Sequence, residues 1–100
     1  MASSTAIVAT VNASRYLQQL CKHWSHTFDV VFDAHHGTIP LPIGTATLKA
    51  TTVVLEVIVE TADLTNLQRL QTVVAEHLDR FAFREAPLPF EWSPAGSPQD

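Results

Sequence analysis

The sequence predicts an α+β fold, a two-layer sandwich in which two amphipathic helices pack on one face of a mostly antiparallel sheet. Strand patterns follow one another through the middle of the chain with short connections, which favours antiparallel pairing. Two further segments, one after Asn12 and one after Asp63, repeat apolar residues at helical spacing. The resulting order is strand, helix, three or four strands, helix and a closing strand, so both helices can share one face of the sheet.

The first helix is expected directly after a short strand at residues 5–10. Asn12 is a suitable N-cap, and Val11 and Tyr16 have the spacing of a hydrophobic staple around it. One face of this helix is apolar and includes the single cysteine of the chain. We therefore expect Cys21 to be a buried packing residue rather than a ligand or nucleophile. The residues of this face are Leu17, Leu20, Cys21 and Trp24.

The middle of the chain is strand-like. "TFDVVFD" (residues 27–33) alternates apolar and polar side chains, and "AHHG" predicts a turn in which Gly37 is available for positive φ. "TIPLPIG" is extended, but Pro40 and Pro42 cannot donate to a ladder, so it is expected at an edge or an irregular crossing. Residues 45–50 and 53–60 predict a hairpin. Its connection, Thr51-Thr52, lacks the Gly or Asn of a tight turn, so a looser turn is expected.

The second helix has the clearest pattern, with Asp63 as its cap. "LPFEW" (residues 88–92) predicts a last strand, and "SPAGSPQD" is polar and rich in Pro and Gly. The expected organisation is one domain over residues 1–92 and a disordered tail over 93–100. The apolar stripe of this helix is Leu67, Leu70, Val74, Leu78 and Phe81. The residues expected to share one core are Leu17, Leu20, Phe32, Leu55, Val57, Leu67, Leu70, Val74 and Leu78.

Composition excludes several classes of function. With 100 residues, 46% of them hydrophobic and 16% charged, the chain has the composition of one globular domain. A net charge of −4 argues against a nucleic-acid partner. No apolar run is long enough for a membrane span, and the first ten residues lack the basic region of a signal peptide. A single cysteine, which permits no intramolecular disulfide, suits a cytoplasmic location.

The stretch "LCKHWSH" (residues 20–26) brings a thiol and two imidazoles together in sequence. On a helix, Cys21 and His23 are about 200° apart, so they face nearly opposite ways and cannot hold one ion. His23 and His26 are about 60° apart and could share an ion if the helix continued, but the strand pattern that follows suggests that it frays. Two histidines are also an incomplete zinc site. Whether a metal binds is left open, and no cofactor is indicated.

A ligand site is expected where the two helices meet. His23 and His77 each lie at the border of an apolar helical face, so they could approach if the helices pack side by side. Arg80, about 60° from His77, would bring a cation to the same rim, which suits an anionic ligand. The tentative ligand-binding residues are thus His23, His26, His77 and Arg80. The alternative is that each histidine is a boundary residue with one ring nitrogen in water.

Two distant stretches, "RYLQQLCKHWSH" and "VVAEHLDRFAFRE", together resemble the bacterial family known as domain of unknown function 2218. The resemblance extends from "STAIVATVNASRYL" to the closing "FEW", and it implies a TATA-binding-protein-like or phosphohexomutase-C-terminal-like α+β layer. Trp24 stands where Phe looks usual in the family, and Thr27 stands where Lys looks usual. The positions that match are Arg15, Tyr16, Leu17, Leu20, Cys21, Lys22, His23, His26, Gly44, His77, Leu78, Arg80, Phe81, Arg84, Glu85 and Trp92.

The resemblance implies a functional context but no chemistry. Some members resemble modules appended to siderophore-interacting, flavin-type ferric reductases, which implies a link to iron uptake. A siderophore-interacting reductase or a small anionic ligand such as a ferric siderophore would then be the partner. The family has no established catalytic residues to carry over.

Three kinds of function remain open at this point. The first is a ligand- or metal-binding accessory domain connected with iron or siderophore use. The second is a structural or interaction module that forms a homodimer through a sheet edge or helix surface. An enzyme has the least support, because the sequence shows no set of nucleophile, base and orienting group and no G-x-S-x-G or H-E-x-x-H motif.

Overall fold

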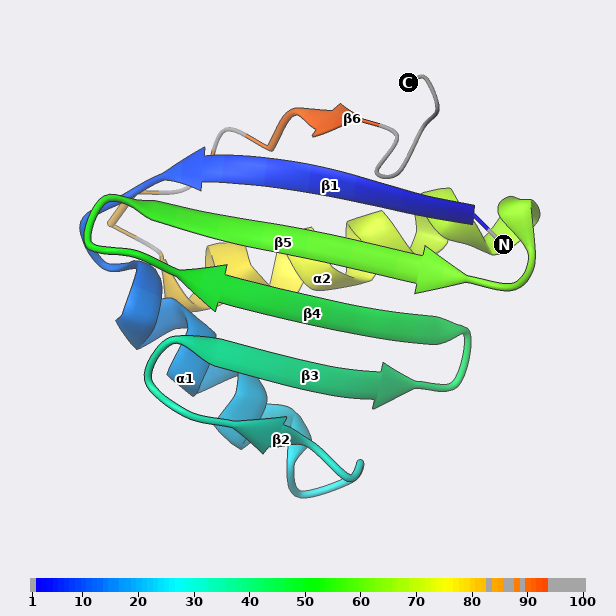
Figure 1. The fold of residues 1–100 in the computed structure, drawn as a ribbon, viewed down its shortest axis with the longest axis horizontal. Coiled ribbons are helices and arrows are strands. Elements are labelled where there is room, and N and C mark those ends of the chain that lie inside the picture. Colours follow the sequence, from blue (N-terminus) through cyan, green and yellow to red (C-terminus); the bar gives the residue numbers. More distant parts are fainter. Residues whose placement is uncertain (1, 83, 86–87, 89, 94–100) are drawn as a thin grey trace.

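The computed structural model describes residues 2–82, 84–85, 88 and 90–93. Within this part of the chain, six strands form one antiparallel sheet in the order β2-β3-β4-β5-β1-β6 (Figure 1). The helices are α1 (Ala13–Trp24) and α2 (Leu67–Phe81), and a 3-10 turn, η1 (Leu64–Asn66), leads into α2. The strands are β1 (Ala2–Ala9), β2 (Val31–Phe32), β3 (His36–Leu41), β4 (Gly44–Ala50), β5 (Val54–Thr61) and β6 (Trp92–Ser93).

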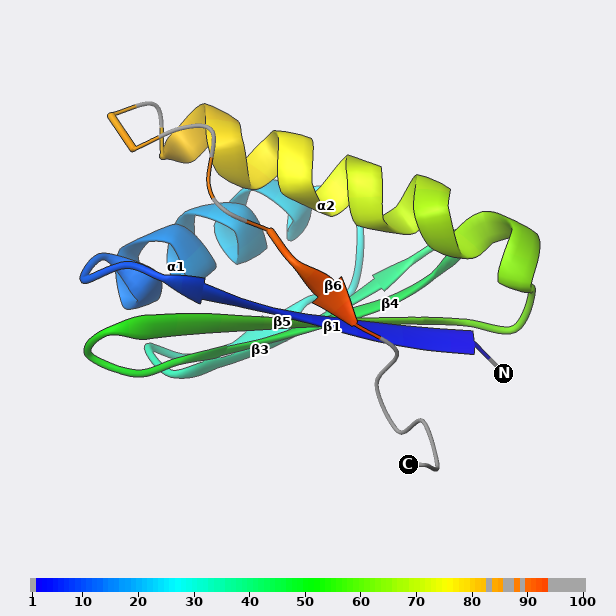
Figure 2. The ribbon, with the colours of Figure 1, turned by 90° about the horizontal axis from the view of Figure 1, so that it is seen from above.

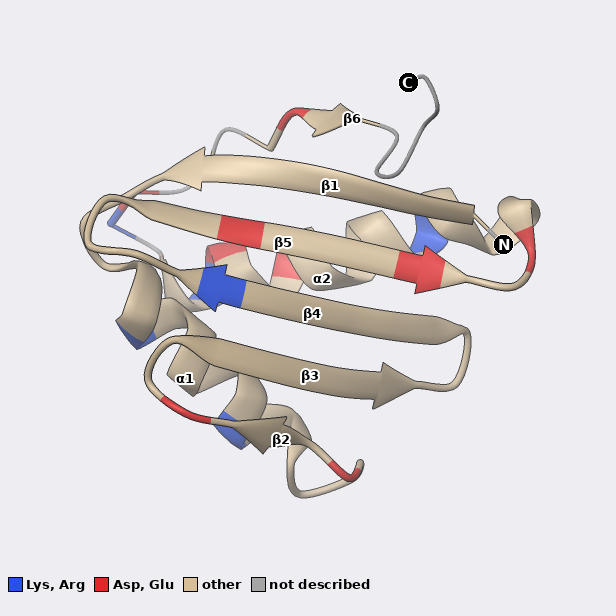
Figure 3. Cartoon of the chain, in the orientation of Figure 1, with Lys and Arg blue, Asp and Glu red and all other residues tan. Residues whose placement is uncertain are grey.

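Both helices lie on the same face of the sheet (Figure 2). α1 contacts β3, β4 and β5, whereas α2 contacts β5 and β1. This arrangement confirms the two-layer α+β fold. Among the described residues, no helix covers the opposite face of the sheet. Lys49 on β4 stands directly across from Glu56 on β5 there (Figure 3). Such opposite charges on neighbouring strands are favourable cross-strand pairs.

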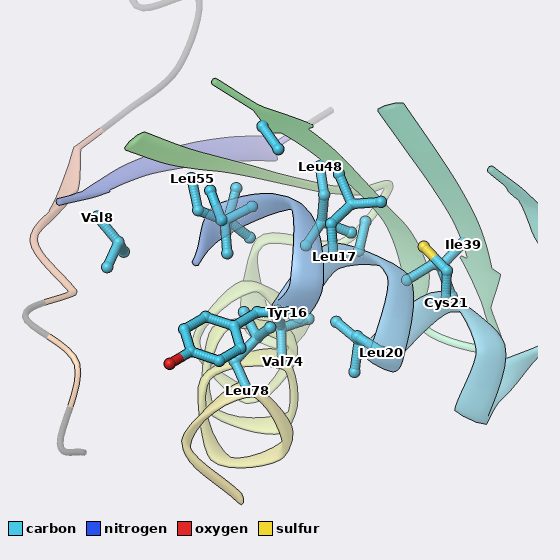
Figure 4. Close-up of a cluster of buried hydrophobic side chains, with 14 of the residues drawn as sticks. Val8, Tyr16, Leu17, Leu20, Cys21, Ile39, Leu48, Leu55, Val74 and Leu78 are labelled. Atoms are coloured by element: carbon cyan, nitrogen blue, oxygen red, sulfur yellow. The ribbon is translucent and has the colours of Figure 1, made fainter. Parts of the chain in front are cut away.

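The core lies between the helices and the covered face of the sheet (Figure 4). Successive side chains of a strand point to opposite faces, so every second residue is buried, as with Leu55, Val57 and Val59 in β5. Of the nine predicted core residues, Leu67 is partly buried and packs against the core. Phe32 is 38% exposed, so its assignment to the core was wrong. It lies in the edge strand β2, which has no further strand to cover it. The other seven are buried: Leu17, Leu20, Leu55, Val57, Leu70, Val74 and Leu78.

The predicted strand over residues 27–33 is the main error in secondary structure, because only Val31–Phe32 forms a strand. The end of α1 explains it. The backbone N–H groups of Thr27 and Phe28 both donate to the carbonyl of Trp24, at 3.0 and 2.9 Å, so the chain turns here instead of extending. Phe28 and Val30 are still partly buried against the core. The alternation in the sequence therefore reported the burial of Phe28 and Val30 correctly, but not that of Phe32, and it predicted the backbone conformation incorrectly.

The predicted turn at "AHHG" lies slightly earlier, at residues 33–35, and His36 and Gly37 belong to β3. The Asp33 carboxylate forms this turn by accepting backbone N–H bonds from His35 and His36, each 2.8 Å long. Gly37 does not have positive φ. It is required for another reason: a β carbon at Gly37 would lie 2.5 Å from the sulfur of Cys21 on α1. Glycine therefore lets α1 approach β3 closely.

The environment of Cys21 matches the prediction of a packing residue. Its side chain has no exposed area, and burial raises the pKa of the thiol to about 12. A thiol in this state is neither a good nucleophile nor a good metal ligand, because both roles need the thiolate. We expect the native protein to resist stoichiometric labelling by a thiol reagent, and rapid labelling would contradict this burial.

A double-mutant cycle tests the contact between Gly37 and Cys21. Gly37→Ala alone is expected to lower the free energy of unfolding by about 1–3 kcal/mol, because the new methyl group overlaps the sulfur. Cys21→Ala alone should cost less, since only one atom is lost. In the double variant the methyl group occupies space left by the sulfur, so the cost should be well below the sum of the two. Urea unfolding measures all three values, and additive costs would exclude the contact.

The remaining boundaries differ little from expectation. The three residues between β4 and β5 form a loose turn, as predicted, in which the Thr51 hydroxyl accepts from the Val54 N–H at 3.0 Å. The second strand of this hairpin was predicted to begin at Val53. Val53 instead lies in the turn and is 58% exposed, so it is not part of the apolar face of β5. Ser93 in β6 pairs with Thr5 in β1, so the sheet extends one residue past the predicted domain boundary at residue 92. Of the tail predicted over 93–100, residues 94–100 lie outside the described residues.

Two further predictions concerned the cap at Asp63 and the prolines of the segment after the "AHHG" turn. Asp63 caps as predicted, but it caps η1: its carboxylate accepts from the Thr65 N–H at 2.9 Å, one turn before α2 begins. Pro40 lies in β3 beyond the two residues that pair with β2, so it is at an edge, and Pro42 lies in the turn between β3 and β4. Neither α1 nor α2 is long and apolar enough to cross a membrane, and the described residues include no other candidate.

Candidate ligand-binding site

Two helices bring four aromatic rings together at the end of α1. His23 and Trp24 come from the last turn of α1, and His77 and Phe81 come from α2. The ring centroids of His23 and His77 are 5.6 Å apart, those of Trp24 and His77 are 4.8 Å apart, and those of His23 and Phe81 are 5.9 Å apart. The structure thus places His23 and His77 side by side, as their positions on the two apolar stripes suggested.

The other residues of the predicted site lie elsewhere. His26 follows the end of α1 and is exposed, and no ring contact joins it to the His23–His77 pair within the described residues. Arg80 is exposed on α2. Cys21 faces β3 on the opposite side of α1. The described residues include no group of three His, Cys, Asp or Glu side chains placed to hold a metal ion.

A pocket of about 300 Å³, here called the Trp24–His77 pocket, opens beside the His23–His77 ring pair. Its walls come from the end of α1, the turn between β3 and β4, and α2 from Arg69 to His77. Pockets that hold small molecules span roughly 300–1,000 Å³ and are mostly apolar with a few polar groups. The Trp24–His77 pocket fits the lower end of that range. It is lined by Trp24, Phe28, Leu41, Pro42, Ile43, Arg69, Leu70, Val73 and His77.

The polar groups of this pocket are Arg69 and His77. The Nδ1 atom of His77 is 2.7 Å from the carbonyl oxygen of Val73, so Nδ1 carries the proton and donates it. Nε2 is then the ring atom left for a ligand. Arg69, two turns earlier on α2, is the cation that lines the pocket, whereas Arg80 is not among the lining residues. The arginine that shares this pocket with His77 is therefore Arg69, and not the predicted Arg80.

A second polar cluster lies at the opposite end of α1, and we call it the Glu85 cluster: Thr10, Asn12, Tyr16 and Glu85. The Glu85 carboxylate accepts hydrogen bonds from the Thr10 hydroxyl at 2.9 Å, from the Asn12 amide at 3.0 Å, and from the Tyr16 hydroxyl. These donors hold the pKa of Glu85 below its usual value, with the Tyr16 bond as the largest cause. Burial and the same bond raise the pKa of Tyr16.

The Glu85 cluster explains why the predicted cap is absent. Asn12 occupies the N-cap position, but its side chain makes no capping bond because it donates to Glu85 instead. Val11 is 77% exposed, so the predicted staple with Tyr16 does not form. The first turn of α1 contains no acidic residue. The charge that stabilises a helix N-terminus is supplied by Glu85, more than 70 positions later.

Removing one donor from this cluster should produce a pH-dependent loss of stability. Tyr16→Phe keeps the ring but deletes the hydroxyl, and it is expected to lower the free energy of unfolding by about 1 kcal/mol at pH 7. The pKa of Glu85 is depressed in the folded state, so its stabilising effect is complete above the usual value of 4.5 and is lost as the pH falls through the lower folded value.

The difference between wild type and Tyr16→Phe should therefore shrink in acid, which denaturant unfolding at several pH values would measure. A difference that stays constant from pH 7 to pH 3 would mean that the lost hydroxyl acts through packing alone.

Sequence reasoning missed the Glu85 cluster as a unit. Its members are separated by about 70 positions, and polar contacts over such a distance leave no periodic pattern. One signal was present, because Tyr16 and Glu85 both belong to the positions that match the family pattern.

Fold and pockets together define a small α+β domain with a ligand-sized apolar pocket between its helices and sheet. The family described as an uncharacterized protein conserved in bacteria, domain of unknown function 2218, matches residues 5–93. The chain belongs to this family.

The comparison with solved structures agrees with this assignment. The chain is similar to the protein in the NMR structure of PA4090 from Pseudomonas aeruginosa, with 37% sequence identity and a TM-score of 0.80. The match covers 97% of this chain and 100% of the other. A search of the curated proteins finds no match.

Proposed function

We propose that the protein is a small ligand-binding module whose Trp24–His77 pocket takes a compact apolar or aromatic molecule bearing one anionic group. The observation that supports this is the pairing of apolar walls with two polar groups, Arg69 and His77, in one pocket. Apolar walls bind through burial, whereas a few placed polar groups orient the ligand.

Different residues of the pocket contact different parts of the ligand. The body of the ligand packs among Trp24, Phe28 and Ile43. Its anionic group meets Arg69 and the Nε2–H of the imidazolium form of His77, the form in which both ring nitrogens donate. A guanidinium suits a carboxylate because it can donate two parallel hydrogen bonds. His23 packs against the His77 ring and supports its orientation, at a centroid separation of 5.6 Å.

A connection with iron stays a prediction from the family resemblance. The pocket volume of about 300 Å³ is small for a whole ferric siderophore. Such a ligand would place one arm in the pocket and leave its metal centre at the mouth. An accessory role beside a siderophore-interacting reductase would be compatible with this, and binding a bare cation would be opposed by Arg69.

Fluorescence of Trp24 can report binding directly. Trp92 is the second tryptophan and stacks on Phe90 at a centroid distance of 5.7 Å, so Trp92→Phe removes the background signal while it keeps an aromatic ring there. We expect phenylacetate to change the Trp24 emission and phenylacetamide, which has the same shape but no charge, to bind more weakly. His77→Ala should weaken phenylacetate binding about tenfold, the effect of losing a hydrogen bond to a charged group.

His26 and Arg80 provide matched controls, because neither lines the Trp24–His77 pocket. His26→Ala removes an exposed imidazole and Arg80→Gln removes an exposed cation, and neither residue lines the pocket, so both variants should bind as the parent does. His23→Ala should weaken binding less than His77→Ala. A ferric hydroxamate complex, titrated calorimetrically, tests the iron connection separately.

The proposal is wrong if phenylacetate binds no better than its amide, or if His26→Ala and His77→Ala behave alike. The homodimerising interaction module would then be preferred. Sedimentation of the unliganded protein at several concentrations would test that alternative.

A further inference from the structure

Every second residue of the long strands points away from the helices, and we call the surface that these residues form the outer face of the sheet. Strands β1, β3, β4 and β5 together contain three Lys, Arg, Asp or Glu residues, and these three, Lys49, Glu56 and Glu60, all lie on this face (Figure 3). Ile7 on β1, which is 60% exposed, and Ile58 on β5, which is partly exposed, also point outward. A sheet face that stays in water is usually polar, so exposed isoleucines among few charges point to a face that is covered.

One row of paired residues crosses the whole sheet on the outer face without a charge. Thr47 on β4 lies near its centre, opposite Thr38 on β3 and Ile58 on β5. At the β2 edge the row ends with Val31, which is 75% exposed. From β2 to β6 the row is Val31, Thr38, Thr47, Ile58, Thr5 and Ser93. The cores of protein interfaces are depleted of charged residues, and this row has such a composition.

The charges on the two sides of this row are complementary to each other. On one side Lys49 lies beside Glu56, and on the other side Glu60 lies beside Thr45. A two-fold axis that runs along the row, between two stacked sheets, exchanges the two sides. It brings Lys49 of one copy over Thr45 of the other, next to Glu60, and it does so twice. The outer face is thus complementary to itself, which favours a second copy of this chain as its partner.

The outer face is also large enough for such a contact. The molecule measures 32 by 29 Å in the two directions of the view in Figure 1, which looks onto this face, and 21 Å through it. A face of this size is comparable with the roughly 800 Å² that each partner buries in a specific interface. Stacked sheets lie about 10 Å apart with their strands within about 30° of each other, so long side chains such as Lys49 and Glu60 can meet across the gap.

We propose that a second copy of the chain packs on the outer face to form a two-fold dimer, in which the two sheets stack and the helices lie outside. Thr47 and Ile58 of both copies form the centre of the interface, and two Lys49–Glu60 pairs flank it. The walls of the Trp24–His77 pocket come from α1, α2 and the β3–β4 turn, so the dimer leaves this pocket open. The dimer therefore neither rests on the proposed ligand binding nor replaces it.

A charge reversal tests the predicted pairing, with sedimentation equilibrium of the full chain as the measurement. Lys49→Glu and Glu60→Lys should each weaken the dimer about tenfold or more, because each places like charges together at both pairs. The double variant Lys49→Glu/Glu60→Lys restores both pairs with reversed signs and should dimerise again. An equimolar mixture of the two single variants should form a heterodimer for the same reason.

A matched pair of lysine substitutions tests the position of the interface. Thr47→Lys places a charge in the centre of the row and should weaken the dimer about tenfold or more, since an unpaired charge would be buried there. Gln68→Lys places the same charge on the exposed side of α2 and should leave the dimer unchanged. His77→Ala should also leave it unchanged, so that a failure of ligand binding and a failure of dimerisation are seen separately.

Thermal unfolding of each variant checks that it is folded. A chain that stays monomeric up to about 1 mM would overturn the proposal, because a weaker contact would not be a specific interface. Equal effects of Thr47→Lys and Gln68→Lys would place the contact elsewhere. A double variant that fails to dimerise, although it is folded, would exclude the Lys49–Glu60 pairing and with it the proposed two-fold axis.

Discussion

Leu70→Ala is expected to lower the free energy of unfolding by about 2–4 kcal/mol. Leu70 is on the buried face of α2 and has no exposed side-chain area. Alanine removes its apolar atoms from the core and leaves a cavity that a packed helix and sheet cannot fill by relaxing. Val74→Ala, one turn later on the same face, removes a smaller side chain and should cost somewhat less.

Urea unfolding of both variants gives these values. Gln68→Ala is the matched control, since Gln68 is exposed on the same helix and its replacement should change stability little. Leu70 also lines the Trp24–His77 pocket, so the cavity left by Leu70→Ala enlarges that pocket. A change near zero for Leu70→Ala would mean that the face of α2 is wrongly assigned.

Gly44→Ala should be at least as damaging, with an expected cost of about 3 kcal/mol or more, the upper range for forcing atoms into a packed site. A β carbon at Gly44 would overlap the backbone carbonyl oxygen of Glu60 and would lie 2.8 Å from a methyl group of Leu70. The first of these contacts is with the backbone of the neighbouring strand β5, which cannot rotate away as a side chain can. Strands β4 and β5 would have to separate locally.

The two glycines in the sheet provide a matched comparison. The obstacle at Gly37 is the side chain of Cys21, and Cys21→Ala removes it. At Gly44, Leu70→Ala removes only the methyl contact and leaves the backbone overlap in place. Gly44→Ala should therefore stay costly in the Leu70→Ala background. Full rescue there would show that the backbone of β5 adapts more readily than these contacts imply.

The parts of the fold that depend on local periodicity were predictable from the sequence. The stripe containing Leu70, Val74 and Leu78 required only helical spacing, and the alternation in β5 required only a period of two. The approach of His23 and His77 followed from their places at the borders of two stripes. Packing two apolar faces together brings their borders together as well.

The features that were missed depend on contacts between distant parts of the chain. Gly37 in a turn-like sequence suggested positive φ, but the actual constraint is the sulfur of Cys21, on another element. Arg69 lines the pocket because of how α2 lies over the β3–β4 turn, which no spacing within α2 reveals. The Glu85 cluster likewise requires that the end of α2 reach the start of α1.

The place of β1 in the sheet has a consequence for the order of folding. β1 is made first, yet it pairs with β5 and β6, and α1 receives its N-terminal charge from Glu85. On the ribosome, β1 therefore waits for β5, and the start of α1 waits for Glu85, both of which are synthesised later. The meander β3–β4–β5 closes only short loops and can form earlier, because closing a short loop costs less entropy. We expect amide protection to appear in this meander before it appears in β1, so that insertion of the N-terminal strand completes the molecule.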